Sequence, residues 1–347
     1  MTDLTFSRTG RPSRIRLSRG GMRGAVLTCV LAAGALASLL TGGRDDVGLA
    51  QLAGLFAGEA ASPAEQTMRD IRLPRTLAAA GLGINLGVAG LLLQAVTRNP
   101  LASPAILGIN QGAALGIVLG LTVPALAVVP GWLLASVFGL AAACLTFAIA
   151  GLVSGRIDSM RLILGGVAVG AIGFSAVRLG YTLEDDIARE VVRWTVGDIA
   201  DLRIDAALRL LAFAVPGLGL AYLMAHRLNL MAMGHAASHG LGFDPRATLV
   251  QGTVLAALLT GVSISVAGPI AFVGLVAPHI ARWLCGADHR RLLPVVVLIG
   301  ATLTIWADAL SKLLPQAEEA PVGIVVAMLG APWLLVSVLR RSGTAHV

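Results

Sequence analysis

Lysine is almost missing from this chain: Lys312 is the single lysine among 347 residues. Because Leu313 follows it, the sequence contains no nucleotide-binding loop of the form G-x-x-x-x-G-K-[ST]. It also contains no H-E-x-x-H zinc motif and no G-x-S-x-G nucleophile motif. These absences predict that the chain is not an enzyme and that it has no nucleotide-binding site of its own.

Charge is also scarce, and this excludes a soluble globular domain. Charged residues make up 13% of the chain and apolar residues 56%, with a mean hydropathy of +0.83. Soluble domains carry about 25% charged and 45–50% apolar residues, so this chain cannot cover a water-facing surface. Three cysteines are present without a C-x-x-C pair, and we interpret them as small packing residues.

Long apolar stretches are what the sequence does contain. Most are close to the ~20 residues that cross ~30 Å of hydrocarbon, although the first, third and eighth are short. The predicted fold is therefore all-α: a polytopic membrane protein with about ten transmembrane helices. The predicted spans are 25–41, 74–96, 105–121, 131–153, 162–181, 205–225, 247–267, 269–284, 292–314 and 322–339.

The distribution of charge orients these spans. With the N-terminus inside, the inner side carries sixteen basic and four acidic residues, and the outer side ten basic and fourteen acidic ones. Basic residues accumulate on the cytoplasmic side of membrane proteins, so we predict a bacterial inner-membrane protein with both termini in the cytoplasm. The pI of about 10.5 then reflects membrane topology, and no nucleic-acid partner is predicted. Six of the inner basic residues precede the first span: Arg8, Arg11, Arg14, Arg16, Arg19 and Arg23.

A cleaved signal peptide is the alternative for the first stretch, since Ala35-Leu36-Ala37 offers small residues. Its removal would leave nine spans and break the charge symmetry, so we retain the stretch as a span. The predicted organisation is an Arg-rich cytoplasmic segment over residues 1–24 and a single ten-helix domain over residues 25–341. The inner loop 226–246 is too short and too rich in glycine to span, and we expect short interfacial helices there.

Asp308 is the one acid that falls clearly inside a predicted span. Ion-coupled carriers usually keep ionisable residues inside their bundle, so the energy for any transport is expected to come from outside this chain. His279 and His289 form no i, i+4 pair that would suggest a metal site with Asp308, and no metal is predicted. Small residues at helical spacing, such as Gly112-x-x-x-Gly116, predict close packing of helices.

Five sequence runs in a fixed order carry a resemblance to a known family. Together they closely resemble the permease subunits of ABC importers for iron–siderophore complexes, haem and cobalamin (FecCD-type), over residues 70–340. The runs are Arg72-Leu73-Pro74-Arg75; Arg98-Asn99-Pro100-Leu101-Ala102-Ser103-Pro104; Leu228-Asn229-Leu230; the stretch from Gly268 to Arg282 with Asp288-His289-Arg290; and Pro321-Val322-Gly323-Ile324.

The resemblance implies a transport subunit that works in a complex. Two copies of the chain would form a homodimer around a central path in the lipid membrane. Two separate ATP-binding cassette subunits would hold ATP and magnesium, and a periplasmic binding protein would deliver the cargo. No cofactor is expected on this chain itself.

The resemblance also assigns roles to residues. Arg72, Arg75 and Lys312 would meet acidic residues of the binding protein, and steering of an acidic partner by fixed positive charge is physically reasonable. Coupling to the ATPase would use the inner loop, and the gate of the path would use two loop–helix junctions, with Pro100 and Pro104 fixing an extended loop. The coupling residues would be Gly234, His235, Leu241 and Gly242, and the gate residues Asn99, Leu101, Ser159 and Met160.

The cargo implied by the resemblance is a ferric chelate, either haem or a ferric siderophore. Cobalamin import is an alternative within the same family. A different class of function is an ion-coupled secondary carrier, which predicts inverted repeats and intramembrane charges that the sequence does not show. A membrane enzyme would require a nucleophile and base, and none is evident.

Overall fold

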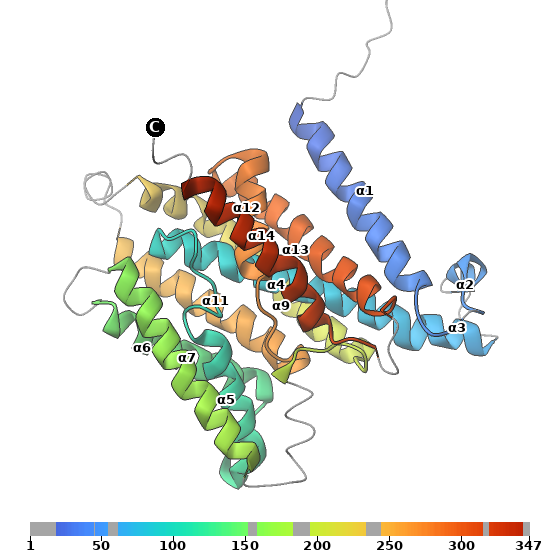
Figure 1. Cartoon of the computed structure of the whole chain (residues 1–347), viewed down its shortest axis with the longest axis horizontal. Helices are drawn as coiled ribbons and strands as arrows, with labels where there is room; N and C mark the ends of the chain where they lie inside the picture. Colours follow the sequence, from blue (N-terminus) through green and yellow to red (C-terminus); the bar gives the residue numbers. More distant parts are fainter. Residues whose placement is uncertain are drawn as a thin grey trace, which may run out of the picture.

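The computed structural model describes residues 19–44, 46–54, 62–151, 158–182, 195–233, 244–314 and 319–342, and within them the regular elements are all helical (Figure 1). The long helices are α1 (Arg19–Leu40), α4 (Leu73–Thr97), α5 (Ile109–Thr122), α6 (Gly131–Ile149), α7 (Ser159–Thr182), α9 (Ile204–Ala232), α11 (Pro245–Ala267), α12 (Val273–Cys285), α13 (His289–Ser311) and α14 (Val322–Ser342). Short elements are α2 (Leu49–Gly54), α3 (Pro63–Thr67), a π-helical turn (Met68–Arg72) and a 3-10 turn (Pro124–Leu126).

The predicted fold class is confirmed. Seven helices of the described residues are long and apolar enough to cross a membrane, and α5, α12 and α14 are shorter apolar helices. Each of these ten helices overlaps one predicted span. The molecule is thus an all-helical, multi-pass membrane protein.

Helix α4 lies at the centre of the bundle, packed against α9, α11, α12 and α13 (Figure 1). Of its most apolar window, 83% is buried inside the chain. Glycine permits this packing, because a Cβ at Gly83 would lie 2.2 Å from the carbonyl oxygen of Gly300 on α13. The prediction that small residues serve helix packing is confirmed here.

The same reasoning explains the sub-bundle of α5, α6 and α7, which lie together in Figure 1. A Cβ at Gly112 would lie 2.5 Å from the carbonyl oxygen of Phe138, and one at Gly116 would lie 2.5 Å from that of Leu134. The Gly112-x-x-x-Gly116 repeat on α5 therefore forms the contact with α6.

Helix α12 begins later than predicted. The predicted span started at Pro269, whereas the helix starts at Val273. Gly268 and Phe272 have left-handed φ angles of 72° and 66°, which a continuous α-helix cannot contain. Phe272 packs against α14, where a Cβ at Gly330 would lie 2.5 Å from its own Cβ. The break shortens α12 to 13 residues.

Two helices extend beyond the predicted spans, α9 at its end and α1 at its start. Helix α9 continues to Ala232, seven residues beyond the predicted end at Ala225, because Leu228 and Met231 are buried in the core and prolong the packed face. The start of the inner loop is therefore helical. Helix α1 begins at Arg19, six residues before the predicted span, so Arg19 and Arg23 are helical, while the division at residue 24 stays a prediction.

Helix α1 is also the least embedded of the long helices: only 11% of its apolar window is buried, and Figure 1 shows it at the edge of the bundle. Its main neighbour is α13. The Trp306 indole donates a hydrogen bond of 3.1 Å to the carbonyl of Val30, and Gly34 provides space for that ring. The polar contacts at the end of α1 are therefore important for its attachment.

Candidate functional site at the basic end of the bundle

A cavity of about 410 Å³ lies where α1 ends and α4 begins. We call this end of the bundle the Arg72 end, defined by Arg72, Arg75 and Lys312. Four of the lining residues are basic and one is acidic, which is unusual in a chain with so little charge. The lining residues are Thr41, Gly42, Gly43, Arg44, Thr67, Ile71, Arg72, Arg75, Lys312 and Glu319.

Arg72 binds the end of α1. It closes the π-helical turn that runs directly into α4, and its guanidinium donates hydrogen bonds of 2.9 and 2.8 Å to the carbonyls of Leu39 and Leu40. These carbonyls belong to the last turn of α1 and have no partner within their helix, so a cation there also complements the helix dipole. A third bond of 3.2 Å reaches the carbonyl of Arg44. Gly42 leaves room, since a Cβ there would lie 3.1 Å from the Arg72 guanidinium.

Arg75 is one helical turn further into α4, and all three of its side-chain nitrogens are engaged. Nε donates to Asp308 Oδ1, Nη1 donates to Glu319 Oε2, and Nη2 donates to Ser311 Oγ at 3.1 Å. Two of these partners come from α13, and Glu319 precedes α14 by three residues. Arg75 thereby connects the start of α4 to the end of α13 and to the segment before α14, which follow it by more than 230 residues.

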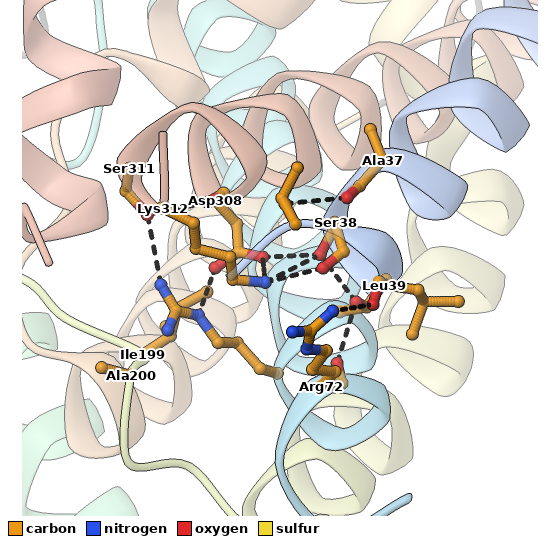
Figure 2. A network of polar contacts seen from close by, with 12 residues as sticks. Ala37, Ser38, Leu39, Arg72, Ile199, Ala200, Asp308, Ser311 and Lys312 are labelled. Carbon is orange, nitrogen blue, oxygen red and sulfur yellow. Dashed lines mark hydrogen bonds and ion pairs between the residues drawn. The ribbon is translucent and has the colours of Figure 1, made fainter. Parts of the chain in front are cut away.

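Asp308 is the centre of this network (Figure 2). Its side chain is completely buried, and its Oδ2 accepts hydrogen bonds from Lys312 Nζ at 2.7 Å and Ser38 Oγ at 2.6 Å. Ser38 also shares a 2.7 Å bond with Thr76 of α4, and its carbonyl accepts from Lys312 at 2.8 Å. One carboxylate thus ties together α1, α4 and α13.

The balance of charge at the cavity favours a further anion. The lining cations are Arg44, Arg72, Arg75 and Lys312, while the nearby acids are Asp46, Asp308 and Glu319. Four cations against three acids leave one positive charge in excess among these seven residues. We assign it to Arg72, because the hydrogen bonds of its guanidinium go to the carbonyls of Leu39, Leu40 and Arg44. The cavity can accept one negatively charged group, and a carboxylate suits the forked guanidinium geometry.

Arg44 and Asp46 form the solvent-exposed rim of this end. Their side chains are joined by hydrogen bonds of 2.9 and 2.6 Å. The Arg44 guanidinium beside Asp46 holds the pKa of that carboxyl below its ordinary value. Since the pair is exposed, it contributes little energy but keeps Asp46 charged at the entrance to the cavity.

The three residues predicted to meet the binding protein are thus brought together by the structure. Their side chains are buried, with Arg72 and Arg75 only 4% and 3% exposed, so a partner would reach them through the cavity rather than on an open face. Docking there stays a prediction. The sequence reading assigned no role to Ser38, Asp308 or Glu319; the Asp308-x-x-x-Lys312 spacing on one helix face was the available signal for Asp308.

The opposite end of the bundle has a second polar cluster, and we call it the Asn229 end, defined by Asn229, Asp288 and His289. Asn229, near the end of α9, donates a 2.7 Å hydrogen bond to Asp288 Oδ1 and accepts a 2.9 Å bond from the His289 backbone. Asp288 also caps α13 by accepting from the Arg290 backbone at 3.1 Å. The bonds from Asn229 and Arg290 hold the pKa of Asp288 below its ordinary value.

The predicted gate residues lie in the segment between α4 and α5 and at the start of α7. Asn99 is buried, and its Oδ1 accepts a 2.9 Å bond from the Leu101 backbone. The segment after Asn99 consists of successive turns and is not extended, because the carbonyls of Asn99, Ser103 and Pro104 accept backbone bonds within it. Ser159 and Met160 open α7, and Met160 is 64% exposed. The prediction of a gate stays untested, while that of an extended loop is wrong.

The predicted coupling residues Gly234, His235, Leu241 and Gly242 lie outside the described residues. Helix α9 ends two residues before Gly234 and α11 begins three residues after Gly242, so the predicted coupling segment connects these two helices. Asn229 therefore anchors the helix that leads into it. In the part of the chain that the structure describes, no group of three or more histidine, cysteine or acidic side chains is arranged to hold a metal.

Comparison with known proteins covers almost the whole chain. Residues 30–340 match the model of the FecCD transport family. The chain is 36% identical over 296 residues to the Fe(3+) dicitrate transport system permease protein of Escherichia coli, covering 83% of this chain and 87% of that protein. It is 36% identical over 278 residues to the hemin transport system permease protein of Yersinia pestis, covering 78% and 83% respectively.

A vitamin B12 import system permease protein of Klebsiella pneumoniae is also 36% identical, over 281 residues that cover 79% of this chain and 82% of that protein. Among solved structures, an inward-facing ABC transporter described as metal-chelate type superimposes with a TM-score of 0.76 at 27% identity, covering 91% of this chain and 98% of that one. The fold, the order of the motifs and these matches agree: the chain belongs to the FecCD transport family, as a multi-pass membrane transport subunit.

Proposed function

We propose that this chain is the permease subunit of an ATP-driven importer that moves a ferric chelate, haem or a ferric siderophore, from the periplasm to the cytoplasm. The observation that carries this proposal is the cationic cavity at the Arg72 end of a family member whose relatives are permeases of such importers. The positive-inside pattern of the sequence supports a periplasmic position for this end and a cytoplasmic position for the Asn229 end.

The complex would contain two copies of this chain, two ATP-binding cassette subunits and one periplasmic binding protein. An acidic residue of the binding protein would enter the cavity and neutralise the excess charge near Arg72 and Arg75. The ATPase would bind at the Asn229 end, where α9 leads into the segment 234–243. The chain itself would hold neither nucleotide nor cofactor, and ATP and magnesium would be bound by the ATPase.

The comparisons support a metal chelate as cargo, but they do not distinguish between haem, a ferric siderophore and cobalamin. The ferric citrate, hemin and vitamin B12 permeases are each 36% identical to this chain. Iron chelates predominate among these relatives, and for that reason we place a ferric chelate ahead of cobalamin.

A secondary carrier driven by an ion gradient would need an accessible ionisable group in the membrane. Among the described residues, the clearest intramembrane acid is Asp308, and both of its carboxylate oxygens are engaged by Arg75, Lys312 and Ser38. Such a carboxylate serves as a fixed counter-charge and not as a proton carrier. This arrangement favours the ATP-driven mechanism.

The test is reconstitution of the permease in liposomes with its partner ATPase and its secreted binding protein. Uptake of haem, ferric citrate, a ferric hydroxamate and cobalamin is measured with and without ATP inside the liposomes. We expect ATP-dependent uptake of an iron chelate that stops when the binding protein is omitted. Uptake by the permease alone under an ion gradient would contradict the proposal. Uptake of cobalamin and of no iron chelate would show that the cargo is cobalamin rather than a ferric chelate.

A further inference from the structure

Glu319 holds the cavity-facing contact of Arg75. The Arg75 guanidinium has three engaged nitrogens, and their partners differ in accessibility. Asp308 and Ser311 are fully buried, whereas the Glu319 side chain is 40% exposed and lines the cavity. Of the three partners of Arg75, Glu319 is therefore the one that the cavity exposes.

We propose that Glu319 is a resident competitor for the docking site: it occupies Arg75 in the undocked transporter and is displaced by an acidic side chain of the binding protein. The proposal rests on the proposed function, because it takes docking at this cavity as given. It follows from the geometry, since a carboxylate cannot approach Arg75 from the buried side without removing Asp308 from its contacts with Lys312 and Ser38.

The exchange conserves charge at Arg75, because one carboxylate leaves as another arrives. Arg75 therefore stays paired throughout, which avoids leaving a buried cation without a counter-charge. Released Glu319 can be hydrated, since it is already partly exposed. The residue lies three positions before α14, so its release changes the contacts at the start of that helix and gives docking a direct effect on the permease.

The proposal makes an unusual prediction: removing a native ion pair should strengthen binding. In the Glu319→Gln variant the incoming acid no longer competes with a charged resident. We expect the dissociation constant of the binding protein to fall by about two- to fivefold, the factor that corresponds to a partly exposed ion pair. Glu319→Ala, which removes the side chain altogether, should bind at least as tightly as Glu319→Gln.

Asp46→Asn is the matched control. It also removes one negative charge from the Arg72 end, but Asp46 pairs with Arg44 and does not contact Arg75. A general electrostatic effect would speed association equally in both variants and disappear at high salt. In the Glu319 variants no resident carboxylate competes for Arg75, so the binding protein should also dissociate more slowly. This slower dissociation should persist at high salt.

The experiment measures association and dissociation rates of the secreted binding protein on the permease–ATPase complex in lipid nanodiscs, at low and high salt. Tighter binding of both Glu319 variants with slower dissociation, and unchanged dissociation in Asp46→Asn, would support the proposal. Weaker or unchanged binding of the Glu319 variants would overturn it.

An Arg75→Gln variant separates this outcome from failure of the proposed docking site. If Arg75→Gln weakens binding while the Glu319 variants leave it unchanged, the docking site stands and the resident competitor does not. If Arg75→Gln binds as well as wild type, with the complex still assembled, the binding protein does not use Arg75 and both proposals fail.

Discussion

The two ends of the bundle are built from different chemistry. At the Arg72 end, a fully buried carboxylate pairs with two cations, and α1, α4 and α13 converge on it. At the Asn229 end, one amide and a helix cap join α9 to α13, and Asp288 is exposed to solvent. Buried ion pairs are weakly screened by salt and very costly to break singly, whereas exposed caps are modest and sensitive to conditions.

The two ends therefore fix their helices by different means. The Asp308 network holds Arg75 and Lys312 in place beside the cavity. At the other end, Asn229 attaches α9 to the start of α13. The following predictions test whether the two ends differ in energy and in sensitivity as the contacts indicate.

The largest effect is expected from Asp308→Asn. The substitution leaves Arg75 and Lys312 buried beside one another with a single neutral acceptor between them, at a cost of about 3–5 kcal/mol in unfolding free energy. Thermal unfolding of the purified permease in detergent measures this cost. Glu319→Gln is the control, since it removes a partly exposed partner of the same arginine and should change stability far less. Equal stability of Asp308→Asn and wild type would show that the network is not essential to the fold.

Arg72→Ala should have a smaller and more local effect. It removes the charged donor from the carbonyls of Leu39 and Leu40, which costs about 1.5–3 kcal/mol for hydrogen bonds to a charged group. We expect faster hydrogen–deuterium exchange in the last turn of α1, while exchange in α4 stays slow. Arg72→Lys should restore the cap only in part, because an ammonium lacks the fork that reaches both carbonyls. Unchanged exchange in α1 would contradict the capping role.

At the Asn229 end, Asn229→Ala should cost about 1–2 kcal/mol, as its hydrogen bonds to the exposed Asp288 carboxylate and to the His289 backbone are lost. The measurement is again thermal unfolding. Arg227→Ala provides a control on the same helix, because its exposed 3.1 Å bond to Gln251 should contribute almost nothing. If Asn229→Ala lowered the unfolding free energy as much as Asp308→Asn, the two ends would not differ in their contribution to stability.

The smallest effect is a dependence on pH at Asp288. Its pKa is lower in the folded state than the ordinary value, so its stabilising contribution is complete above an unfolded pKa of about 4 and is lost as the pH falls through the folded value. The stability difference between wild type and Asp288→Asn should therefore be constant from pH 7 to 5 and shrink below about pH 4. Unfolding curves across this range check it, and a difference that grows toward acid would have the wrong sign.

Much of this molecule follows from the sequence alone. Hydropathy and charge are properties of short segments, so they sufficed to predict ten helices in nearly their observed places. Errors occurred where local signals conflict with packing: the buried Leu228 and Met231 prolong α9, and the left-handed Phe272 delays α12. The motifs around Arg72 and Arg75 similarly indicated the correct end of the molecule for a basic site.

The tertiary structure alone decided which charges meet. The sequence placed Asp308 inside a span but could not pair it with Ser38, 270 residues away, or with Arg75, 233 residues away. Nor did it reveal that Glu319 reaches Arg75, because no periodicity relates a loop residue to a helix that precedes it by 244 positions. The physical reason is that the hydropathy of consecutive residues determines where a transmembrane helix forms, and this property can be read along the chain. Ion pairs form instead between whichever side chains the packed helices bring within a few ångströms of one another.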